Sequence, residues 1–453
     1  MTAVAAGPRP AGPVPGPPRR AALSLLMRMA RDRLTVMRDV SARYGDAVRL
    51  PLGPKTLYFF NHPEHAKHVL ADNAENYRKG IGLVHARRVL GDGLLTSEGE
   101  LWREQRRVIQ PAFQARRIAR QAEAIAREAA ALSDRLRALV GAGPVDMRQE
   151  MTRLSLGVLG RTLLDADLAP FGSLAESFEA VQDQAMFEMM SLNTVPLWAP
   201  LPRQLRFHRA RRELERAVDG LVAEHGGREG EDVLSRLIAS TRREADPAVA
   251  RRRMRDELVT LLLAGHDTTA STLGWALYLI DAHPQTWARM HAEAAAVLTG
   301  ERVVYEDLHR LPYTTAVVQE AMRLYPPVWL LPREAVAADR VGGHPVPAGA
   351  DVLICPYTLH RHPEFWAEPD RFDPERFAAR RAGERHRYAY LPFGAGPRVC
   401  VGSSLGMMEA TIVLATLARE LRLSLAPGHR VVPEPMLTLR ARGGLPMLVH
   451  RAV

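Results

Sequence analysis

The stretch from Leu391 to Gly402, LPFGAGPRVCVG, constrains this chain more than any other. Its glycines and prolines predict a tight loop before Cys400, because glycine adopts unusual backbone angles at low cost. Apolar residues at helical spacing follow over 405–414, so Cys400 stands just before the N-terminus of a helix. The helix dipole and the unpaired N–H groups there favour a thiolate over a thiol. The sequence therefore predicts a sulfur ligand presented by a loop.

An isolated cysteine is more often a small buried hydrophobic residue, and only the surrounding pattern argues otherwise. That pattern is F-x-x-G-x-R-x-C-x-G, formed by Phe393, Gly396, Arg398, Cys400 and Gly402. It resembles the haem-binding signature of the cytochrome P-450 family. The resemblance implies haem b (iron protoporphyrin IX) with Cys400 as the axial ligand, a thiolate being a strongly donating ligand for haem iron. It also implies that Phe393 packs beside the sulfur and that Arg398 pairs with a haem propionate.

Two further arginines are predicted to bind the haem propionates. Trp102 and Arg106 are four residues apart and share one helix face, which on its own favours a core tryptophan and a solvated arginine over a binding role. The W-x-x-x-R pattern resembles the propionate-binding helix of the same family, and Arg333 resembles its third propionate-binding arginine. Arginine suits this role because it is permanently charged and presents forked donors.

The polar run 264–269 interrupts an apolar helix predicted from Leu258 to Ile280. Buried polar groups are costly unless they are paired or functional, and threonines that bond their own helix carbonyls are the simpler explanation. The run resembles the A-G-x-D-T-T motif of the family, in which Asp267 and Thr268 would hold a water and supply protons for oxygen cleavage. Two small residues are predicted to leave room for a flat cofactor: Ala264 and Gly265.

A second motif predicts a structural network. Glu320 and Arg323 lie three residues apart on a helix predicted over 314–325, and the sequence there resembles the E-x-x-R helix of the family. Arg376 lies in a segment that resembles the P-E-R-F segment. The resemblance implies that the three side chains lock the core and take no part in catalysis.

An apolar substrate pocket is predicted from several separate segments. A methionine-rich stripe is more often core than pocket, although methionine adapts well to variable ligands. The proline-punctuated segment 193–202 is predicted to form a loop between two helices, which the resemblance implies is a lid. The residues predicted to line the pocket are Leu83, Val84, Met186, Met190, Val328, Trp329, Leu330 and Leu437.

No linker, charge block or repeat divides the 453 residues, which predicts one domain over 21–453 after a disordered, proline-rich N-terminus at 1–20. Alanine, leucine and arginine dominate the periodic segments, so we expect a mainly α protein with small β-sheets. The resemblance implies the triangular, helix-rich cytochrome P-450 fold enclosing haem.

The net charge of +10 is spread over many helices and interleaved with acids, which argues against nucleic-acid binding and favours solvated helix faces. Two cysteines imply no disulfide framework, and no secretory signal or membrane anchor is evident. We expect a cytoplasmic protein, acting as a monomer.

The predicted activity is that of a haem-dependent monooxygenase, which inserts one atom of dioxygen into a C–H bond of an apolar small molecule. Terpenoid, fatty acyl, steroid and polyketide-like substrates all fit, as does a role in bacterial secondary metabolism. No flavin or iron–sulfur domain is recognised, so electrons from NAD(P)H would arrive through a ferredoxin and a ferredoxin reductase. A haem-thiolate gas sensor without turnover and a peroxide-using haem-thiolate enzyme are the alternatives.

Overall fold

The computed structural model describes residues 12–53, 55–168, 174–191, 194–228, 230–242, 244–300, 302–378, 383 and 385–452. Two compact units make up the chain. Unit 1 contains the chain up to residue 84 together with 328–371 and 383–400, and unit 2 contains 85–327, 372–382 and 401–453. The single domain expected over 21–453 stays a prediction. Because each unit is assembled from separate segments, no linker marks the boundary between them.

Unit 1 combines short helices with a small sheet. Its elements are α1 (Ala22–Arg31), α2 (Arg33–Tyr44), β1 (Ala47–Leu52), β2 (Lys55–Phe60), α3 (Pro63–Lys67), β3 (Tyr77–Lys79), β5 (Leu331–Ala335), β6 (Asp339–Val341), β7 (His344–Val346), β8 (Asp351–Ile354) and α14 (Pro356–Leu359). The helix α4 (Leu83–Leu90) contains the division between the two units.

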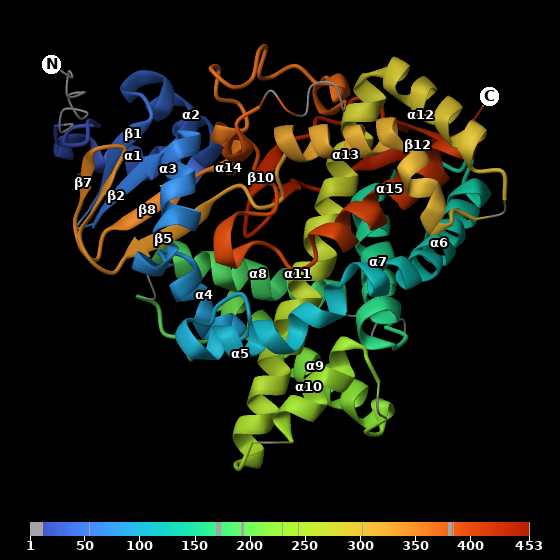
Figure 1. The fold of residues 1–453 in the computed structure, drawn as a ribbon, viewed down its shortest axis with the longest axis horizontal. Helices are drawn as coiled ribbons and strands as arrows, with labels where there is room; N and C mark the ends of the chain where they lie inside the picture. Colours follow the sequence, from blue (N-terminus) through green and yellow to red (C-terminus); the bar gives the residue numbers. More distant parts are fainter. Residues whose placement is uncertain are drawn as a thin grey trace, which may run out of the picture. The chain divides into compact units, whose positions relative to one another are not determined.

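The sheet of unit 1 has the strand order β1-β2-β8-β5-β3. Strands β1 and β2 form an antiparallel hairpin, whereas β2 pairs with β8 in parallel, with Leu57 opposite Asp351. Figure 1 shows these strands side by side although they come from opposite ends of the sequence. Strand β8 is buried along its whole length, as expected for a central strand covered on both faces. Its antiparallel neighbour β5 contains Arg333, which lies opposite Val352 of β8.

The segment before α1 is packed against this sheet. Val14 is buried in the core of unit 1, and the Arg49 N–H donates a hydrogen bond of 2.7 Å to the Pro15 carbonyl. The predicted disorder over 1–20 therefore differs from the structure over 12–20. The remaining part of that prediction, residues 1–11, lies outside the described residues. Composition alone missed the contact because it depends on a strand edge that the sequence does not reveal.

Unit 2 is mostly helical. Its elements are α5 (Gly99–Ile109), α6 (Ala115–Ala138), β4 (Val145–Asp146), α7 (Met147–Leu159), α8 (Leu174–Ser191), α9 (Pro202–His225), α10 (Val233–Thr241), α11 (Pro247–Ala282), α12 (Pro284–Val297), α13 (Pro312–Leu324), α15 (Ser403–Glu420), β9 (Leu421–Leu425), β10 (Pro433–Pro435), β11 (Leu439–Ala441) and β12 (Pro446–Arg451). The mainly α architecture with small sheets agrees with the prediction.

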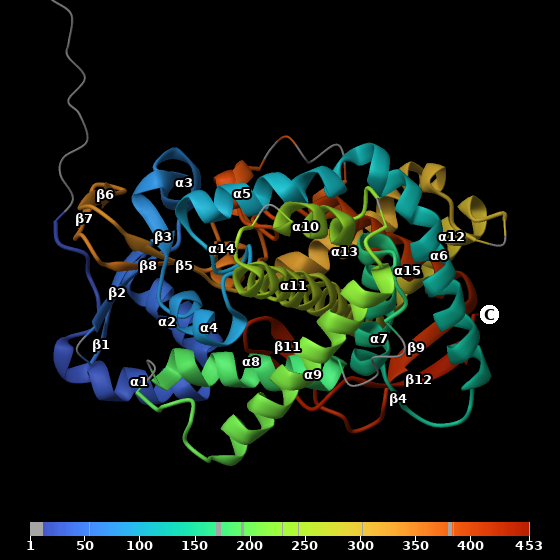
Figure 2. The ribbon, with the colours of Figure 1, turned by 90° about the horizontal axis from the view of Figure 1, so that it is seen from below.

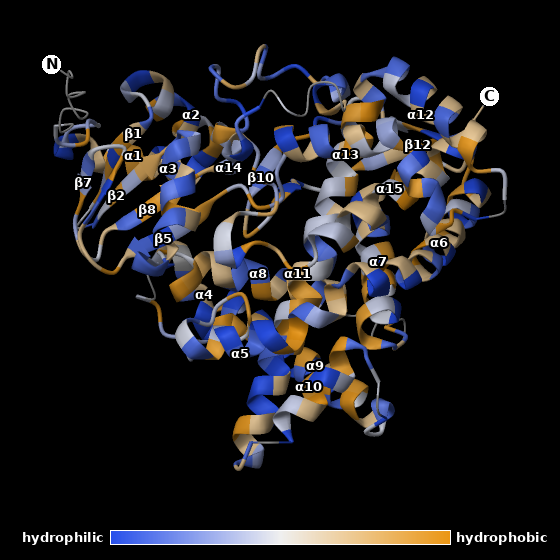
Figure 3. Cartoon of the chain, viewed as in Figure 1, coloured by the Kyte–Doolittle hydropathy of each residue, from blue (hydrophilic) through white to orange (hydrophobic). Residues whose placement is uncertain are grey.

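The long helix α11 is central to the packing of unit 2. It lies against α7, α13, α10 and α15, and Figure 2 shows α8 and α9 lying against one another beside it. Figure 3 shows apolar and polar segments alternating along α6, the pattern of a helix with one face in the core. The β10–β11 hairpin also contacts α11 through β11.

None of the helices in the described ranges combines the length and the apolar character needed to cross a bilayer.

Candidate functional site

The loop before Cys400 is held in one conformation by its glycines. Gly394 and Gly396 have φ of +71° and +68°, a region that other residues rarely adopt. A Cβ on Gly396 would lie 1.8 Å from the Leu70 carbonyl oxygen, so a larger residue does not fit there. The Cys400 N–H donates a hydrogen bond of 2.9 Å to the Phe393 carbonyl, which closes the loop.

Cys400 is exposed, and α15 begins three residues after it. The order of loop, cysteine and helix is the one predicted from the sequence. Arg398 lies in the one-turn helix Gly396–Arg398, and Gly402 is the N-cap of α15. An accessible sulfur on a rigid loop just before a helix N-terminus is the donor that a haem-thiolate site requires. The residues present therefore fit this cofactor.

The other cysteine is unsuited to such a role. Cys355 is fully buried, its Sγ–H donates a hydrogen bond of 3.1 Å to the Trp329 carbonyl, and burial raises the pKa of its thiol. A buried, protonated thiol is chemically inert. In the described part of the chain, no group of three or more His, Cys, Asp or Glu side chains is arranged to hold a metal ion.

The middle of α11 contains accessible residues, although the residues just before them are buried. Residues 258–263 are buried, Ala264 is exposed, and Asp267 and Thr268 are half-buried. The Thr268 hydroxyl donates a hydrogen bond of 2.8 Å to the Ala264 carbonyl, which commits its hydrogen to the helix and leaves its lone pairs as acceptors. The back-bonding threonines and the open face are thus both present in this helix.

Gly265 serves the packing of α11 on α7. A Cβ at this position would lie 2.0 Å from the Leu159 Cδ1 atom, so a side chain at position 265 would require the Leu159 side chain to move. The sequence-based expectation that the bare backbone of Gly265 also leaves room for a cofactor stays a prediction. Ala264 is the exposed member of this pair.

His266, between the motif residues, is buried and packs its ring 4.9 Å from the ring of Phe178. Burial lowers the pKa of His266, so the imidazole is neutral. It therefore provides no charged partner for the neighbouring Asp267.

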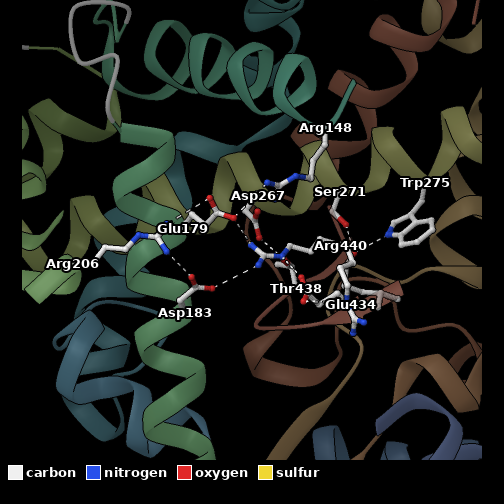
Figure 4. Close-up of polar contacts among 12 residues, drawn as sticks. Arg148, Glu179, Asp183, Arg206, Asp267, Ser271, Trp275, Glu434, Thr438 and Arg440 are labelled. Atoms are coloured by element: carbon white, nitrogen blue, oxygen red, sulfur yellow. Dashed lines mark hydrogen bonds and ion pairs between the residues drawn. The ribbon is translucent and has the colours of Figure 1, made fainter. Parts of the chain in front are cut away.

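The partner of Asp267 is Thr438, whose hydroxyl donates a hydrogen bond to the carboxylate Oδ2. Figure 4 shows the two side chains pointing toward each other, one from α11 and the other from the turn between β10 and β11. The sequence pattern identified this turn through Leu437 but gave no signal for Thr438. A contact between residues 171 positions apart leaves no trace in local spacing.

The propionate-binding candidates are half-buried in both units. Trp102 and Arg106 lie on α5, where the Arg106 Nε donates a hydrogen bond of 3.1 Å to the Gln110 Oε1. In unit 1, Arg333 lies on β5, and its guanidinium donates a hydrogen bond of 2.9 Å to the Pro332 carbonyl. Their roles toward a haem stay predictions.

The structure brings Glu320, Arg323 and Arg376 together in the core of unit 2. Arg323 donates to both carboxylate oxygens of Glu320, at 2.6 and 2.7 Å, and both side chains are fully buried. Arg376 lies 3.5 Å from the same carboxylate, which also accepts a hydrogen bond from the Asp373 N–H. Such a bidentate, fully satisfied buried pair ties α13 to the segment around residue 375.

The pocket candidates are divided between the two units. Met186 is buried in α8, as expected for a core residue, whereas Met190 in the same helix is 42 % exposed. In unit 1, Trp329 is buried and Val84 is 48 % exposed. The half-buried candidates are Leu83, Val328 and Leu330 in unit 1 and Leu437 in unit 2. The lid segment 193–202 is described from residue 194 onward, and Asn193 lies outside the described residues.

An ion-pair network that the sequence did not reveal holds the β10–β11 hairpin to α8 (Figure 4). Arg440 on β11 donates hydrogen bonds to Glu434 at 2.9 Å and to Glu179 at 3.2 Å. Its guanidinium also lies 3.7 Å from the Asp183 carboxylate. Arg206 from α9 bonds Asp183 at 3.1 Å. We call these five residues the hairpin–helix network.

A buried acid lies in α15, nine residues beyond Cys400. The Ser155 hydroxyl donates a hydrogen bond of 2.8 Å to Glu409, and both residues are buried. Burial raises the pKa of Glu409 to about 8. The signal was available in the sequence, since Glu409 is the charged residue inside the apolar run 405–414.

Comparison with known proteins gives a consistent result. The family model described as cytochrome P-450 matches residues 13–445. A cyclooctatin synthase of Streptomyces melanosporofaciens is 39 % identical, covering 91 % of this chain and 90 % of its own. Cyclooctat-9-en-7-ol 5-monooxygenase of the same organism is 36 % identical, covering 85 % and 84 %. Pentalenene oxygenase of Streptomyces avermitilis is 31 % identical, with 91 % of each chain covered.

Proposed function

Because this chain belongs to the cytochrome P-450 family, we propose that Cys400 is the axial haem ligand and that Asp267 and Thr268 supply protons to the reaction. The protein is a haem-dependent monooxygenase. The bound haem supplies the activation of dioxygen, of which one atom enters a C–H bond of the substrate and the other leaves as water. The reaction also requires two electrons.

The chain's own residues hold the cofactor and control protons. Phe393 and Gly396 shape the loop that presents the sulfur, and the guanidinium groups of Arg106, Arg333 and Arg398 are suited to bind propionates as forked donors. Thr268 offers lone pairs to a water, because its hydrogen is donated to a backbone carbonyl. Asp267 is the nearest acid to that position along the helix and can exchange protons with such a water.

One observation carries the assignment of the ligand: Cys400 is exposed on a loop that glycines and a backbone hydrogen bond hold in place. The test is the absorption of the reduced protein under carbon monoxide, which is shifted to the red for thiolate-ligated haem. We expect Cys400→Ala to abolish that band and Cys355→Ala, a matched control at the buried thiol, to keep it. A thiolate-type band that survives in Cys400→Ala would refute the assignment.

We propose that the substrate is a terpenoid. The support is that two of the relatives are named for reactions on cyclooctat-9-en-7-ol and pentalenene. The apolar pocket predicted from the sequence agrees with such a ligand.

The substrate class is tested by titrating the purified protein with four probes: cyclooctat-9-en-7-ol, pentalenene, a long-chain fatty acid and a steroid. A terpenoid that displaces water from ferric haem shifts the Soret band, and product formation is followed by mass spectrometry. We expect saturable shifts with one or both terpenoids at lower concentration than with the other probes. Tighter binding and turnover of the fatty acid or the steroid would overturn the proposal.

We further propose that electrons arrive from a ferredoxin in a reducing, cytoplasmic environment, where Cys355 and Cys400 would stay unoxidised. Arg103 and Arg107 on α5 lie 3.2 and 4.0 Å from the exposed Glu100, but they are themselves 57 % and 72 % exposed and so remain accessible to an acidic partner. Arg117 on α6 is only 18 % exposed and lies 2.7 Å from Glu231. We therefore assign the docking role to α5.

A further inference from the structure

Three residues on one face of α11 contact two consecutive residues of the β10–β11 hairpin, Thr438 and Leu439 (Figure 4). Asp267, Ser271 and Trp275 are spaced four apart and so align along the helix. The Ser271 hydroxyl and the Trp275 indole N–H, the latter at 2.8 Å, both donate to the Leu439 carbonyl. The preceding residue, Thr438, donates its hydroxyl to Asp267. The hairpin is thus fixed along two turns of α11.

The same hairpin is held from its other side by the hairpin–helix network. Arg440, two residues after Thr438, pairs with Glu179 and Asp183 of α8, and its side chain is only 14 % exposed. Thr438 itself is buried, with 7 % of its surface exposed. Its hydroxyl is therefore located by packing, by hydrogen bonds to α11 and by ion pairs to α8, and it has little freedom to turn away from Asp267.

A hydroxyl donor acts on a carboxylate differently from a cation. It orients the group and occupies one oxygen, but it leaves the charge in place, whereas an arginine or lysine would neutralise it. The neighbouring His266 is buried and neutral, so it does not compensate that charge. Thr438 occupies one lone pair of Oδ2, so Oδ1 keeps both of its lone pairs for a water.

We propose that Thr438 is a positioning residue for proton supply: its hydroxyl holds the Asp267 carboxylate so that Oδ1 meets the water beside Thr268. This inference rests on the role proposed above for Asp267. Reduction of dioxygen to two waters consumes four electrons and four protons, whereas release as hydrogen peroxide consumes two of each. A carboxylate that turns away from its position delivers the later protons less often, and more dioxygen leaves as peroxide.

The test uses three variants of the haem-loaded protein. Thr438→Val removes the hydroxyl at nearly constant volume, Thr438→Ser keeps it, and Ser271→Ala removes the neighbouring bond to the hairpin without touching Asp267. Each is supplied with NADPH, a plant-type ferredoxin and its reductase, without organic substrate, and the ratio of water to peroxide is measured. We expect Thr438→Val to lower this ratio about tenfold, in the range for losing a hydrogen bond to a charged group. Thr438→Ser and Ser271→Ala should stay within about twofold of wild type.

A second readout needs no turnover. The infrared carboxylate band of Asp267 in the ferric protein is isolated by subtracting the spectrum of Asp267→Asn. We expect this band to shift in Thr438→Val and to keep its wild-type position in Thr438→Ser and Ser271→Ala. An unshifted band in Thr438→Val would show that the hydroxyl does not hold the carboxylate, and the inference would fail.

The controls separate this inference from the role of Asp267. If Asp267→Asn keeps the wild-type ratio, or if the wild type itself forms only peroxide, the proposed role of Asp267 is wrong. If Asp267→Asn lowers the ratio but Thr438→Val does not, only the inference about Thr438 is wrong. An equal loss in Ser271→Ala would assign the effect to the hairpin as a whole and would also overturn it. Adding Thr438→Val to Asp267→Asn should change nothing further.

Discussion

Glu409 shows what a single buried acid does to the pH dependence of this protein. Burial raises its pKa to about 8, so the folded chain keeps a proton that the unfolded chain releases above pH 4.5. The stabilisation from protonated Glu409 is complete below pH 4.5 and is lost as the pH rises through about 8. In the physiological range the wild type therefore becomes less stable with increasing pH at this site.

We expect Glu409→Gln, which stays neutral at all pH values, to remove this dependence. The stability of the variant relative to wild type should increase by about 4 kcal/mol between about pH 5 and about pH 8. Urea unfolding at several pH values measures the difference, with the exposed Glu123→Gln on α6 as a control that should follow the wild type. Parallel curves for wild type and Glu409→Gln would contradict a raised pKa.

Gly396 and Gly394 allow a matched comparison within the cysteine loop. Both have positive φ, but only at Gly396 would a Cβ collide with a backbone atom, whereas nothing lies within 4 Å of the corresponding position at Gly394. We expect Gly394→Ala to cost about 1 kcal/mol, the penalty of its backbone angles. Gly396→Ala should cost about 3 kcal/mol or more and displace the sulfur.

The haem content per protein and the carbon monoxide band distinguish these two variants. Retention of both properties in Gly396→Ala, at the level of Gly394→Ala, would mean that the contact with Leu70 does not fix the loop.

At the scale of elements, the approach of α11 to α7 depends on Gly265. We expect Gly265→Ala to destabilise the protein by about 1–3 kcal/mol, because its Cβ would overlap the Leu159 Cδ1 atom. Leu159→Val removes that atom and should recover part of the loss, so that the two substitutions are not additive. Thermal unfolding of the single and double variants gives the coupling.

Gly274, further along the same helix, provides the control for this prediction. A Cβ there would lie 4.0 Å from Leu445, an ordinary contact. Gly274→Ala should therefore be neutral or stabilise by about 0.5–1 kcal/mol through helix propensity. A comparable loss in both glycine variants would argue against the specific overlap at Leu159.

The elements that carry strong local signals were predictable from the sequence. The predicted helix over 314–325 corresponds to α13, and the helix predicted from Leu258 to Ile280 lies within α11. These succeed because periodicity and capping act within a few residues. The loop before Cys400 was predictable for the same reason, because glycines indicate locally where the backbone turns.

Contacts between distant segments were not predictable in the same way. The hydroxyl of Thr438 and the charge of Arg440 acquire their partners only when the hairpin packs on α11 and α8, more than 150 positions away in the sequence. Val14 was assigned to a disordered tail because a proline-rich composition says nothing about the strand edge that it covers. The sequence predicted that Gly265 leaves room for a cofactor but gave no sign of its contact with Leu159 of α7, which is 106 positions away in the sequence.

At the scale of the whole molecule, the net charge of +10 should accelerate association with an acidic ferredoxin. We expect the double variant Arg103→Glu, Arg107→Glu to slow reduction about tenfold at low ionic strength. The difference should shrink near about 0.5 M salt, where the Debye length falls below the size of the contact. Stopped-flow reduction by the ferredoxin measures both rates.

Arg251→Glu, at a position where the side chain is 79 % exposed near the start of α11, is the control and should change the rate little. An equal slowing in this control would indicate a general charge effect without a docking site on α5.

The parallel pairing of β2 with β8 has a consequence for synthesis in the cell. Phe60 meets Ile354, so 294 further residues (354 minus 60) must leave the ribosome before the central strand reaches its place. At usual translation rates this takes about 15–60 s, during which the β1–β2 hairpin has an open, apolar edge. Until β8 has been synthesised, the exposed edge of β2 can pair with other chains unless a chaperone covers it. We therefore expect the yield of soluble protein to depend more on growth temperature than on the stability of the folded protein.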